Sequence, residues 1–583
     1  MTLFTSCRLT AAAALCLIAS LAGCNRSTPA PAAPSPESVA AQKLDECRSR
    51  LNGAVVRVSP ESMAGQSRKD GVVNAVNSWL ASCAEADVRK LAVSDANAAL
   101  LSPDALRTAK ATRFSETDVV YIRDCLMLNG LTSAVWKQIQ TSNDAAAADR
   151  QRVTAFFRQI VRLIALLPPN DSRPPVGLYE SLLTGRGFLE DRIWAFTEGL
   201  RQRQIDCLVL HASTPGNHSS SVTESADWLV AAIVGDDTLL FDPLRGTAVP
   251  AVGDQTFPPQ NPAGLAAIKD LDRWKNASVF AVVHPSAPAP RMLVLQQQMD
   301  AADTAILYEE LAGGTSEIRP LLQRIPPAVL ALWPASALKL WPVPEQRINA
   351  SAVTTEQQKQ TLQTLLKHFD SPFERASIDR EKLLADANVD EAQLSQEELD
   401  ALVANALAEM LQRSDTLFGK PSRRLLKARV SQLSGNFEPG MIQELQQIRI
   451  ASLQESIDIN FSEGAQMLTR RIPLPETILS VQRAAVADAL YWTALTQMSR
   501  NDFGTAVQTL RNFRRQYPES PLRFAAELNE AEALAELGNP AAAAEVLANA
   551  NIPENPEQIR TAWLRAALTA AAPTTPTPQT PNP

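Results

Sequence analysis

The sequence is poor in the residues from which catalytic and metal sites are most often built. Its 583 residues include only four histidines, and no two stand at the spacing that places ligands on one helix face. It also lacks a Cys-x-x-Cys pair and the glycine-rich patterns that bind dinucleotides and nucleoside triphosphates. The histidines are His211, His218, His284 and His368. We therefore expect no metal, no nucleotide and no other cofactor.

An excess of positive charge is also missing. The chain has 55 Lys and Arg residues against 63 Asp and Glu residues, a net charge of −8. Nucleic-acid-binding domains are usually basic, so no nucleic-acid partner is expected. The densest basic run, residues 420–429, falls in a helical pattern, and we interpret it as a solvated helix face.

Beyond the N-terminus, no apolar run is long enough to cross a bilayer. Residues 1–23 have the charge and the apolar length of a signal peptide. They end in Leu21-Ala22-Gly23-Cys24, which resembles a bacterial lipobox, so we expect Cys24 to carry acyl chains such as palmitate. The alternative is an ordinary secretory signal that ends near a cysteine.

The two ends of the mature chain have the composition of unfolded segments. Residues 24–38 are rich in Pro, Ala and Ser and are expected to form a tether, while 571–583 are expected to form a disordered tail. The protein is then lipid-anchored in the cell envelope and faces the periplasm or the exterior.

Disulfides can persist in that compartment. Without the signal peptide and the acylated Cys24, the remaining cysteines are Cys47, Cys83, Cys125 and Cys207, which permit three pairings. Cys47 with Cys83 is the favoured bond because both lie in the N-terminal helical region, and Cys125 with Cys207 would be the residual pair. Four buried free thiols are the alternative.

The chain is too long for one hydrophobic core, so a multidomain protein is expected. Helical periodicity predicts a helical region over 39–167 and a helical middle region over 291–480, in which residues 332–344 form a proline-rich break between helices. Between them, residues 168–290 contain one helix followed by short strand-like runs with a hairpin turn at 235–237, which indicates a small α+β domain. The fold class is thus mainly α with one α+β domain and, over 481–570, helical hairpins.

Residues 481–570 carry the hint of a repeat. The turn pattern at Asn501 returns at Gly538, a spacing of 37 residues (538 − 501). Two such units resemble tetratricopeptide helical hairpins, whose usual repeat is about 34 residues. A bundle of unrelated hairpins is the alternative.

The α+β segment contains three short motifs in a fixed order: GLRQRQIDC at 199–207, ADWLV at 226–230 and LFDP at 240–243. Together they resemble the core of the transglutaminase-like, papain-related superfamily over about 80 residues. That family places a nucleophilic cysteine at a helix start, a histidine ahead of an aromatic residue, and an aspartate at the end of the next strand. The resemblance implies this fold for 168–290.

The same resemblance places three positions of a catalytic triad on this chain. The nucleophile position falls on Leu189, the histidine position falls on Ala226 (or on Asp227 after a slip of one residue), and only the acid, Asp242, is retained. Leucine offers no lone pair and alanine cannot shuttle a proton. No catalytic residue is therefore expected, and Asp242 is left to cap its turn.

The complete layout is similar to a group of uncharacterised bacterial lipoproteins that also contain the motif Tyr121-Ile122-Arg123-Asp124. The expected function is a non-enzymatic, membrane-anchored scaffold that binds a protein or an envelope polymer through its C-terminal helices. One alternative is a cysteine-dependent amidase or transglutaminase-like enzyme with relocated residues, Cys207 with His211 or His218. Another is a structural subunit of an envelope assembly.

Overall fold

The computed structural model describes most of the chain between Pro36 and Ala571. The expected signal peptide, the acylation site Cys24, the tail from residue 572 onward, His218 and His368 lie outside the described residues. Shorter gaps fall at 66–68, 140–144, 169, 172, 217–221, 252–258, 260, 300–304, 312–324, 353–354, 367–368, 370–379, 390–393, 403–404, 406–423, 452–455, 464–465 and 474–475. The chain divides into two units, Met1–Ser49 and Arg50–Pro583, and every element described below lies in the second unit except residues 36–49 of the first helix.

The N-terminal part is helical, as its periodicity predicts. Its first helix begins at Pro36, inside the segment that we expected to be a tether up to residue 38. The long helix α7 begins at a capping box, in which Ser115 and Asp118 each accept a hydrogen bond from the other's backbone N–H. The helices are α1 (Pro36–Val58), α2 (Pro60–Gly65), α3 (Lys69–Trp79), η1 (Leu80–Ala84), α4 (Glu85–Lys90), α5 (Asp95–Leu100), α6 (Pro103–Lys110), α7 (Glu116–Gln138) and α8 (Ala145–Leu163).

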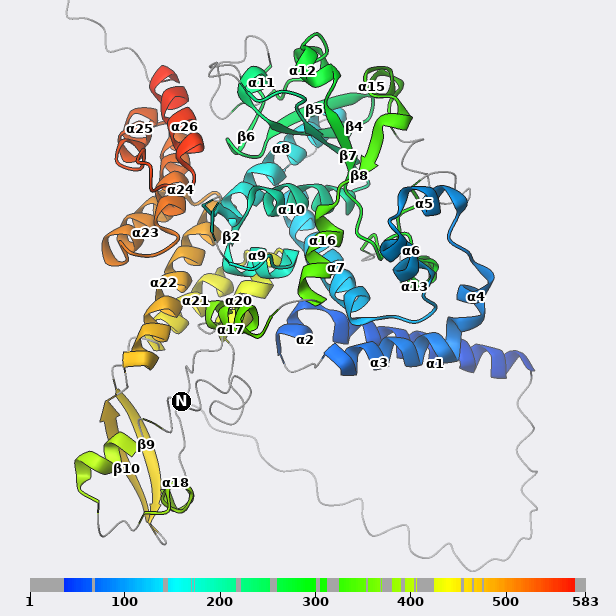
Figure 1. Ribbon diagram of the computed structural model, residues 1–583. Coiled ribbons are helices and arrows are strands. Elements are labelled where there is room, and N and C mark those ends of the chain that lie inside the picture. The colour runs from blue at the N-terminus through cyan, green and yellow to red at the C-terminus, as the bar shows by residue number, and fades with distance from the viewer. Residues whose placement is uncertain are drawn as a thin grey trace, which may run out of the picture. The chain divides into compact units, whose positions relative to one another are not determined.

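A six-stranded mixed sheet forms the β part of the α+β region (Figure 1). The strand order is β6-β5-β4-β3-β7-β8, and only the β7–β8 pair is parallel. The expected turn at 235–237 joins β4 to β5, and Gly235 there has φ of 63°, which a residue without Cβ adopts easily. The elements are β1 (Ala165–Leu166), α9 (Leu178–Thr184), β2 (Arg186–Gly187), α10 (Leu189–Arg201), β3 (Cys207–His211), α11 (Val222–Ser225), β4 (Trp228–Val234), β5 (Asp237–Asp242), β6 (Thr247–Ala248), η2 (Leu265–Ala267), α12 (Asp272–Lys275) and β7 (Ser278–Ala281).

Alternate residues of the same strands bury both faces of this sheet. Val209 of β3 packs in a cluster with Phe157 of α8 and Phe196 of α10. Its neighbour Leu208 belongs to the opposite cluster, together with Trp274 of α12. Successive side chains of a strand point to opposite faces of the sheet, so each strand contributes apolar side chains to both clusters. This explains why the sequences of these strands are almost continuously hydrophobic.

The region 291–480 is not the purely helical segment that we expected. The segment 338–340, which we interpreted as part of a proline-rich break, forms β8 and adds an edge strand to the sheet. Strands β9 and β10 pair as a separate antiparallel hairpin. Helix α13 ends at Gln298, and the buried stretch 305–311 that follows is not helical. The elements are α13 (Pro290–Gln298), α15 (Pro327–Leu332), η3 (Ala335–Ala337), β8 (Leu338–Leu340), α16 (Val343–Ala352), α17 (Glu356–Leu366), α18 (Arg380–Ala387), α20 (Arg424–Leu433), α21 (Pro439–Ala451), β9 (Ser456–Glu463) and β10 (Gln466–Pro473).

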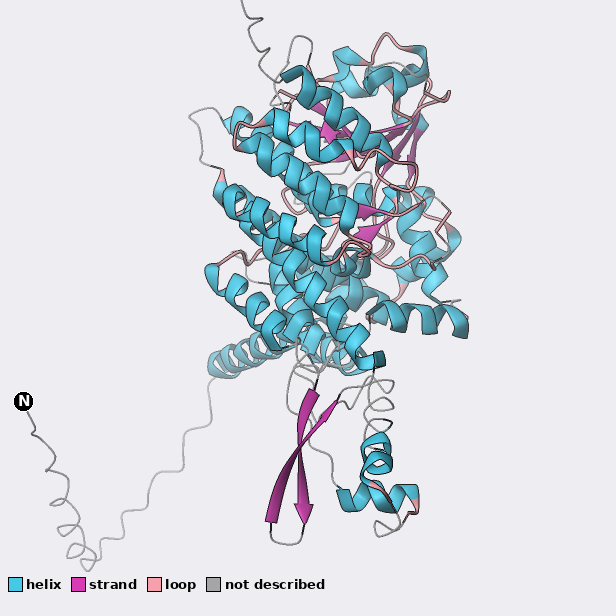
Figure 2. Cartoon of the chain, turned by 90° about the vertical axis from the view of Figure 1, so that its left-hand side faces the viewer, coloured by secondary structure: helices cyan, strands magenta, loops and turns pink. Residues whose placement is uncertain are grey.

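The C-terminal helices stack as antiparallel pairs (Figure 2). The turns at Asn501 and Gly538 are equivalent, since both residues have positive φ, 60° and 76°, after a helix end. In each case the next residue, Asp502 or Asn539, caps the following helix with its side chain. The repeat that the sequence indicated is therefore also a structural repeat. Its helices are α22 (Glu476–Ser499), α23 (Phe503–Gln516), α24 (Arg523–Glu536), α25 (Pro540–Ala548) and α26 (Gln558–Ala571).

Candidate functional site

The structure describes all three positions that were taken from the triad pattern. Leu189 is the first residue of α10, Ala226 lies two residues ahead of β4, and Asp242 ends β5. Arg192, in the first turn of α10, donates a hydrogen bond to the carbonyl of Pro243, the residue that follows β5, at 2.9 Å. The start of the helix and the end of the strand are therefore in direct contact. Leu189 packs against the main apolar cluster and Ala226 is buried. The first two side chains supply only apolar surface.

Asp242 is fully buried, and its neighbours hold its carboxylate in place. Oδ1 accepts hydrogen bonds from the backbone N–H groups of Leu244 and Arg245, each at 2.9 Å. Oδ2 pairs with the Arg245 guanidinium at 2.6 Å, and that guanidinium also donates to Ser225. Burial raises the pKa of Asp242, and the Arg245 charge opposes that rise. The carboxylate closes the turn after β5.

The relocated pair Cys207 and His211 does not meet. The two residues are the first and last of β3, four residues apart, which corresponds to about 13 Å along a strand. The His211 ring instead stacks on Trp228 with 4.2 Å between centroids. Burial raises the pKa of the Cys207 thiol well above its usual value, so the thiolate is disfavoured.

One of the two expected cysteine pairs is not formed. Cys47 and Cys83 are disulfide-bonded, whereas Cys125 and Cys207 are free, buried thiols. The expected residual bond between Cys125 and Cys207 is therefore wrong. The two belong to different apolar clusters, and the Cys125 thiol lies 3.3 Å from the Arg201 guanidinium.

Cys125 belongs to a buried polar cluster that includes the motif tyrosine. The Tyr121 hydroxyl donates to the Leu307 carbonyl and accepts from Arg201, each at 2.7 Å. Arg201 also pairs with Glu198 one turn earlier on α10. His284 stacks on the Tyr121 ring at 4.4 Å, and burial lowers its pKa to about 3, so this imidazole is neutral at physiological pH. The cluster joins α7 and α10 to the stretch 305–311.

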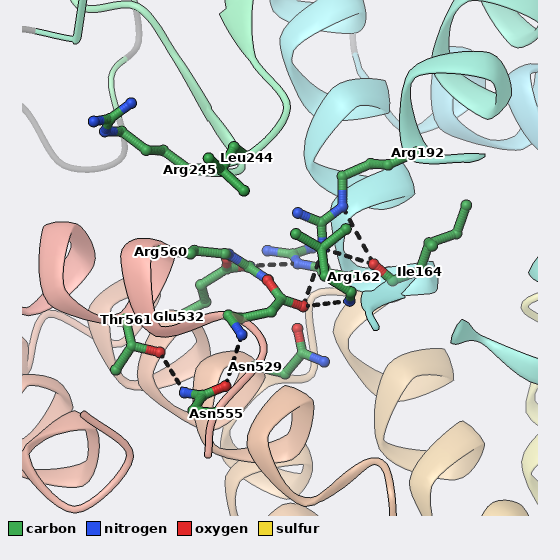
Figure 3. A network of polar contacts seen from close by, with 12 residues as sticks. Arg162, Ile164, Arg192, Leu244, Arg245, Asn529, Glu532, Asn555, Arg560 and Thr561 are labelled. Carbon is green, nitrogen blue, oxygen red and sulfur yellow. Dashed lines mark hydrogen bonds and ion pairs between the residues drawn. The ribbon is translucent and has the colours of Figure 1, made fainter. Parts of the chain in front are cut away.

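A second buried polar network joins α10 to the C-terminal helices (Figure 3). Arg192 donates to the Ile164 carbonyl at 2.7 Å and pairs with Glu557 at 3.0 Å. Glu557 also accepts from the Leu166 N–H at 3.0 Å and from Arg560 at 3.1 Å. Two residues separated by 365 positions thus share one ion pair.

The network continues to helix α24. Arg560 reaches Glu532 at 2.5 Å, and Arg162 of α8 donates to the other oxygen of Glu532 at 3.0 Å. Burial alone would raise the pKa of Glu532, but Arg560 and Arg162 outweigh it and lower the pKa to about 2. For Glu557, the charges of Arg192 and Arg560 likewise outweigh burial, and the net change in pKa is downward. Both carboxylates are ionised at neutral pH.

Every residue of helix α24 from Ala525 to Leu534 is buried. Helix α23 has only Ala506, Val507, Leu510 and Phe513 buried, so its opposite face is exposed. Within the C-terminal hairpins, α23, α25 and α26 each keep an exposed face, while α24 packs within its own chain.

The tetratricopeptide repeat family model matches residues 488–520. These residues cover the second half of α22, the turn at Asn501 and all of α23. No curated protein and no solved structure shows a significant match. The matched repeat suggests that protein partners bind through the C-terminal helices.

The described part of the chain offers little for other classes of site. No cluster of three or more His, Cys, Asp or Glu side chains in it could hold a metal ion. None of its helices combines the length and the hydropathy that a membrane span requires.

Reasoning from the sequence missed Arg429. It lies in the basic run that we interpreted as a solvated helix face, yet it is fully buried. Its guanidinium stacks on the Trp492 ring at 3.5 Å and donates to the Leu182 and Leu183 carbonyls at the C-terminus of α9. Burial lowers its pKa to about 9. The apolar residues on both sides, Leu425 to Val430, were the available signal that this part of the helix is internal.

Replacing Arg192 tests the buried network. We expect Arg192→Met to lower the free energy of unfolding by about 3–5 kcal/mol, because Glu557 would stay buried with part of its compensation removed. Urea denaturation of the full chain measures this. The matched control is Arg150→Met, which breaks an exposed pair with Asp237 and should cost less than about 1 kcal/mol. Equal costs for the two variants would contradict the proposed importance of the network.

Acid should weaken the same network. A carboxylate with a lowered folded-state pKa stabilises the protein fully above its ordinary pKa, which is 4.5 for Glu532, and loses that contribution as the pH falls towards 2. We expect the urea midpoint to drop between pH 5 and pH 3. Glu532→Gln should be less stable at pH 7 and show a shallower drop. An identical pH profile for the variant and the parent protein would exclude Glu532 as a source of the acid sensitivity.

Proposed function

We propose that this chain is a non-enzymatic, membrane-anchored lipoprotein that binds another protein through its C-terminal helices. The observation that carries the proposal is the tetratricopeptide repeat at 488–520, whose helix α23 keeps one face exposed. Repeats of this type are stacked helical pairs that present surfaces to peptides and proteins.

The anchor rests on sequence chemistry. A short apolar segment that ends in Leu21-Ala22-Gly23-Cys24 supplies a thiol for acylation, and the Pro-rich stretch to residue 35 supplies reach from the membrane. The folded part would then work at the membrane surface, in the periplasm or on the exterior, where the disulfide bonding of Cys47 and Cys83 is stable.

The α+β region would serve as a rigid platform of the transglutaminase-like type. Its order of helix and strands agrees with that resemblance, while Leu189 and Ala226 supply no nucleophile and no base. The competing proposal, a cysteine-dependent amidase or transglutaminase-like enzyme, needs a thiolate near an imidazole. Against it stand the burial of Cys207 and its separation from His211 along β3.

Photocrosslinking in intact cells tests the binding proposal. A photoreactive residue at Gln508 or Asn512, both on the exposed face of α23, should give a discrete crosslinked protein product. The same residue at Lys275, exposed on α12, is the control and should give none. Crosslinks of equal yield from all three positions, or from none, would contradict binding through α23.

Metabolic labelling with an alkyne-tagged fatty acid tests the anchor. The parent protein should incorporate the label and sediment with membranes, whereas Cys24→Ser should lose the label and move to the soluble fraction, because no other acylation site is expected. Cys7→Ser is the control, since Cys7 lies in the expected signal peptide. A labelled Cys24→Ser protein would disprove acylation at this residue.

A further inference from the structure

A cavity of about 710 Å³ lies where three distant parts of the chain meet. Helix α7 forms one wall, the turn between α20 and α21 forms the second, and the turn between α22 and α23 forms the third. This volume lies in the range of about 300–1,000 Å³ that is typical of ligand sites. Its third wall, from Ser499 to Asn501, belongs to the matched tetratricopeptide repeat.

The base of the cavity is a close backbone contact. A Cβ atom at Gly130 would stand 2.3 Å from the Ser434 carbonyl oxygen, and one at Gly435 would stand 2.4 Å from the Gly130 carbonyl oxygen. Gly435 also has φ of 88°. Only glycine permits this approach at both positions, so α7 and the α20–α21 turn are held at a fixed separation.

The lining combines cationic groups with hydrogen-bonding groups. Lys137 and Arg500 are exposed on the rim, and among the described residues neither has a carboxylate within ion-pair distance. The Arg500 guanidinium is oriented by one hydrogen bond to the Phe437 carbonyl at 3.0 Å. The hydrogen-bonding side chains of Gln138 and Asn501 are exposed beside Lys137 and Arg500. Glu438 is the one acidic residue that lines the described cavity.

A third cation lies behind the α7 wall. The Arg203 guanidinium donates to the Asn129 carbonyl at 2.9 Å and to the Ser133 hydroxyl, and both of these residues line the cavity. On the lining itself, Lys137 and Arg500 outnumber Glu438, and Arg203 adds a positive charge behind α7, so we expect the cavity to attract anionic groups.

We propose that this cavity binds an acidic stretch of a polypeptide partner. This inference rests on the proposed function, and it places the contact with the partner at the matched repeat. The partner's carboxylates pair with Lys137 and Arg500 at the rim. Its backbone or side-chain polar groups hydrogen-bond to the exposed polar side chains of the lining, Gln138 and Asn501. Guanidinium and ammonium groups bind carboxylates through charge-assisted hydrogen bonds, which are stronger than neutral ones.

Fluorescence polarisation with the full chain tests this. The probes are three labelled peptides of about eight residues, alternating Gly with Glu, with Gln or with Lys. The Glu peptide should bind, with an affinity that falls as salt rises, and the Gln and Lys peptides should not. Lys137→Gln combined with Arg500→Gln should weaken binding about tenfold, since two partly exposed ion pairs are lost.

Two further variants make the test sharper. Glu438→Gln removes the only carboxylate among the described lining residues and should tighten binding of the Glu peptide severalfold. Lys275→Gln combined with Arg565→Gln removes two exposed cations elsewhere and should change nothing. Urea denaturation of each variant confirms that it is folded.

Two outcomes would overturn the inference: equal binding of the Glu peptide by the Lys137/Arg500 variant and the parent protein, or a preference for the Gln or Lys peptide. The proposed function fails separately. Crosslinks from Gln508 together with no effect of the cavity variants would leave protein binding intact and exclude this cavity. The absence of crosslinks from α23, with the Glu peptide still bound, would instead exclude binding through that helix.

Discussion

The ion pair between Arg192 and Glu557 is the contact on which the arrangement of the second unit depends. Arg192 also binds the carbonyls of Ile164 and Pro243, so one side chain touches the end of α8, the turn after β5 and the C-terminal helices. A buried charge is costly unless every polar atom around it is satisfied. Removing the C-terminal helices would leave this guanidinium without a carboxylate, and the α+β region and the hairpins therefore stabilise each other.

Two buried arginines show two solutions to the same electrostatic problem. Arg192 is compensated by a carboxylate, whereas Arg429 relies on carbonyls at the C-terminus of α9, on Gln432 and on the face of Trp492. A helix C-terminus carries partial negative charge, and an indole face attracts a cation. Burial lowers the pKa of both arginines, to about 9 for Arg429. Both arginines join segments that are distant in sequence.

The sequence predicted the features that are encoded locally. The turn at Gly235, the cap formed by Asp242 and the 37-residue repeat from Asn501 to Gly538 each follow from a few neighbouring residues. The strand β8 and the partner of Arg192 could not be found in this way. A strand of three residues has too little pattern, and an ion pair across 365 positions leaves no periodic trace. The cavity beside Gly130 was missed for the same reason, since its walls are distant in the chain.

The contacts of Asp242 bear on whether the α+β region could support catalysis. An acid that orients an imidazole needs a free oxygen facing the ring. Here one oxygen accepts two backbone N–H groups and the other pairs with Arg245, all within a fully buried turn. To accept a hydrogen bond from a histidine, the carboxylate would have to give up these donors, and the charge of Arg245 would then be uncompensated. The position at which the triad pattern places the histidine is occupied by Ala226. Asp242 is thus engaged in holding the strand end beside α10, and Arg192 of that helix pairs with Glu557 at the C-terminal hairpins.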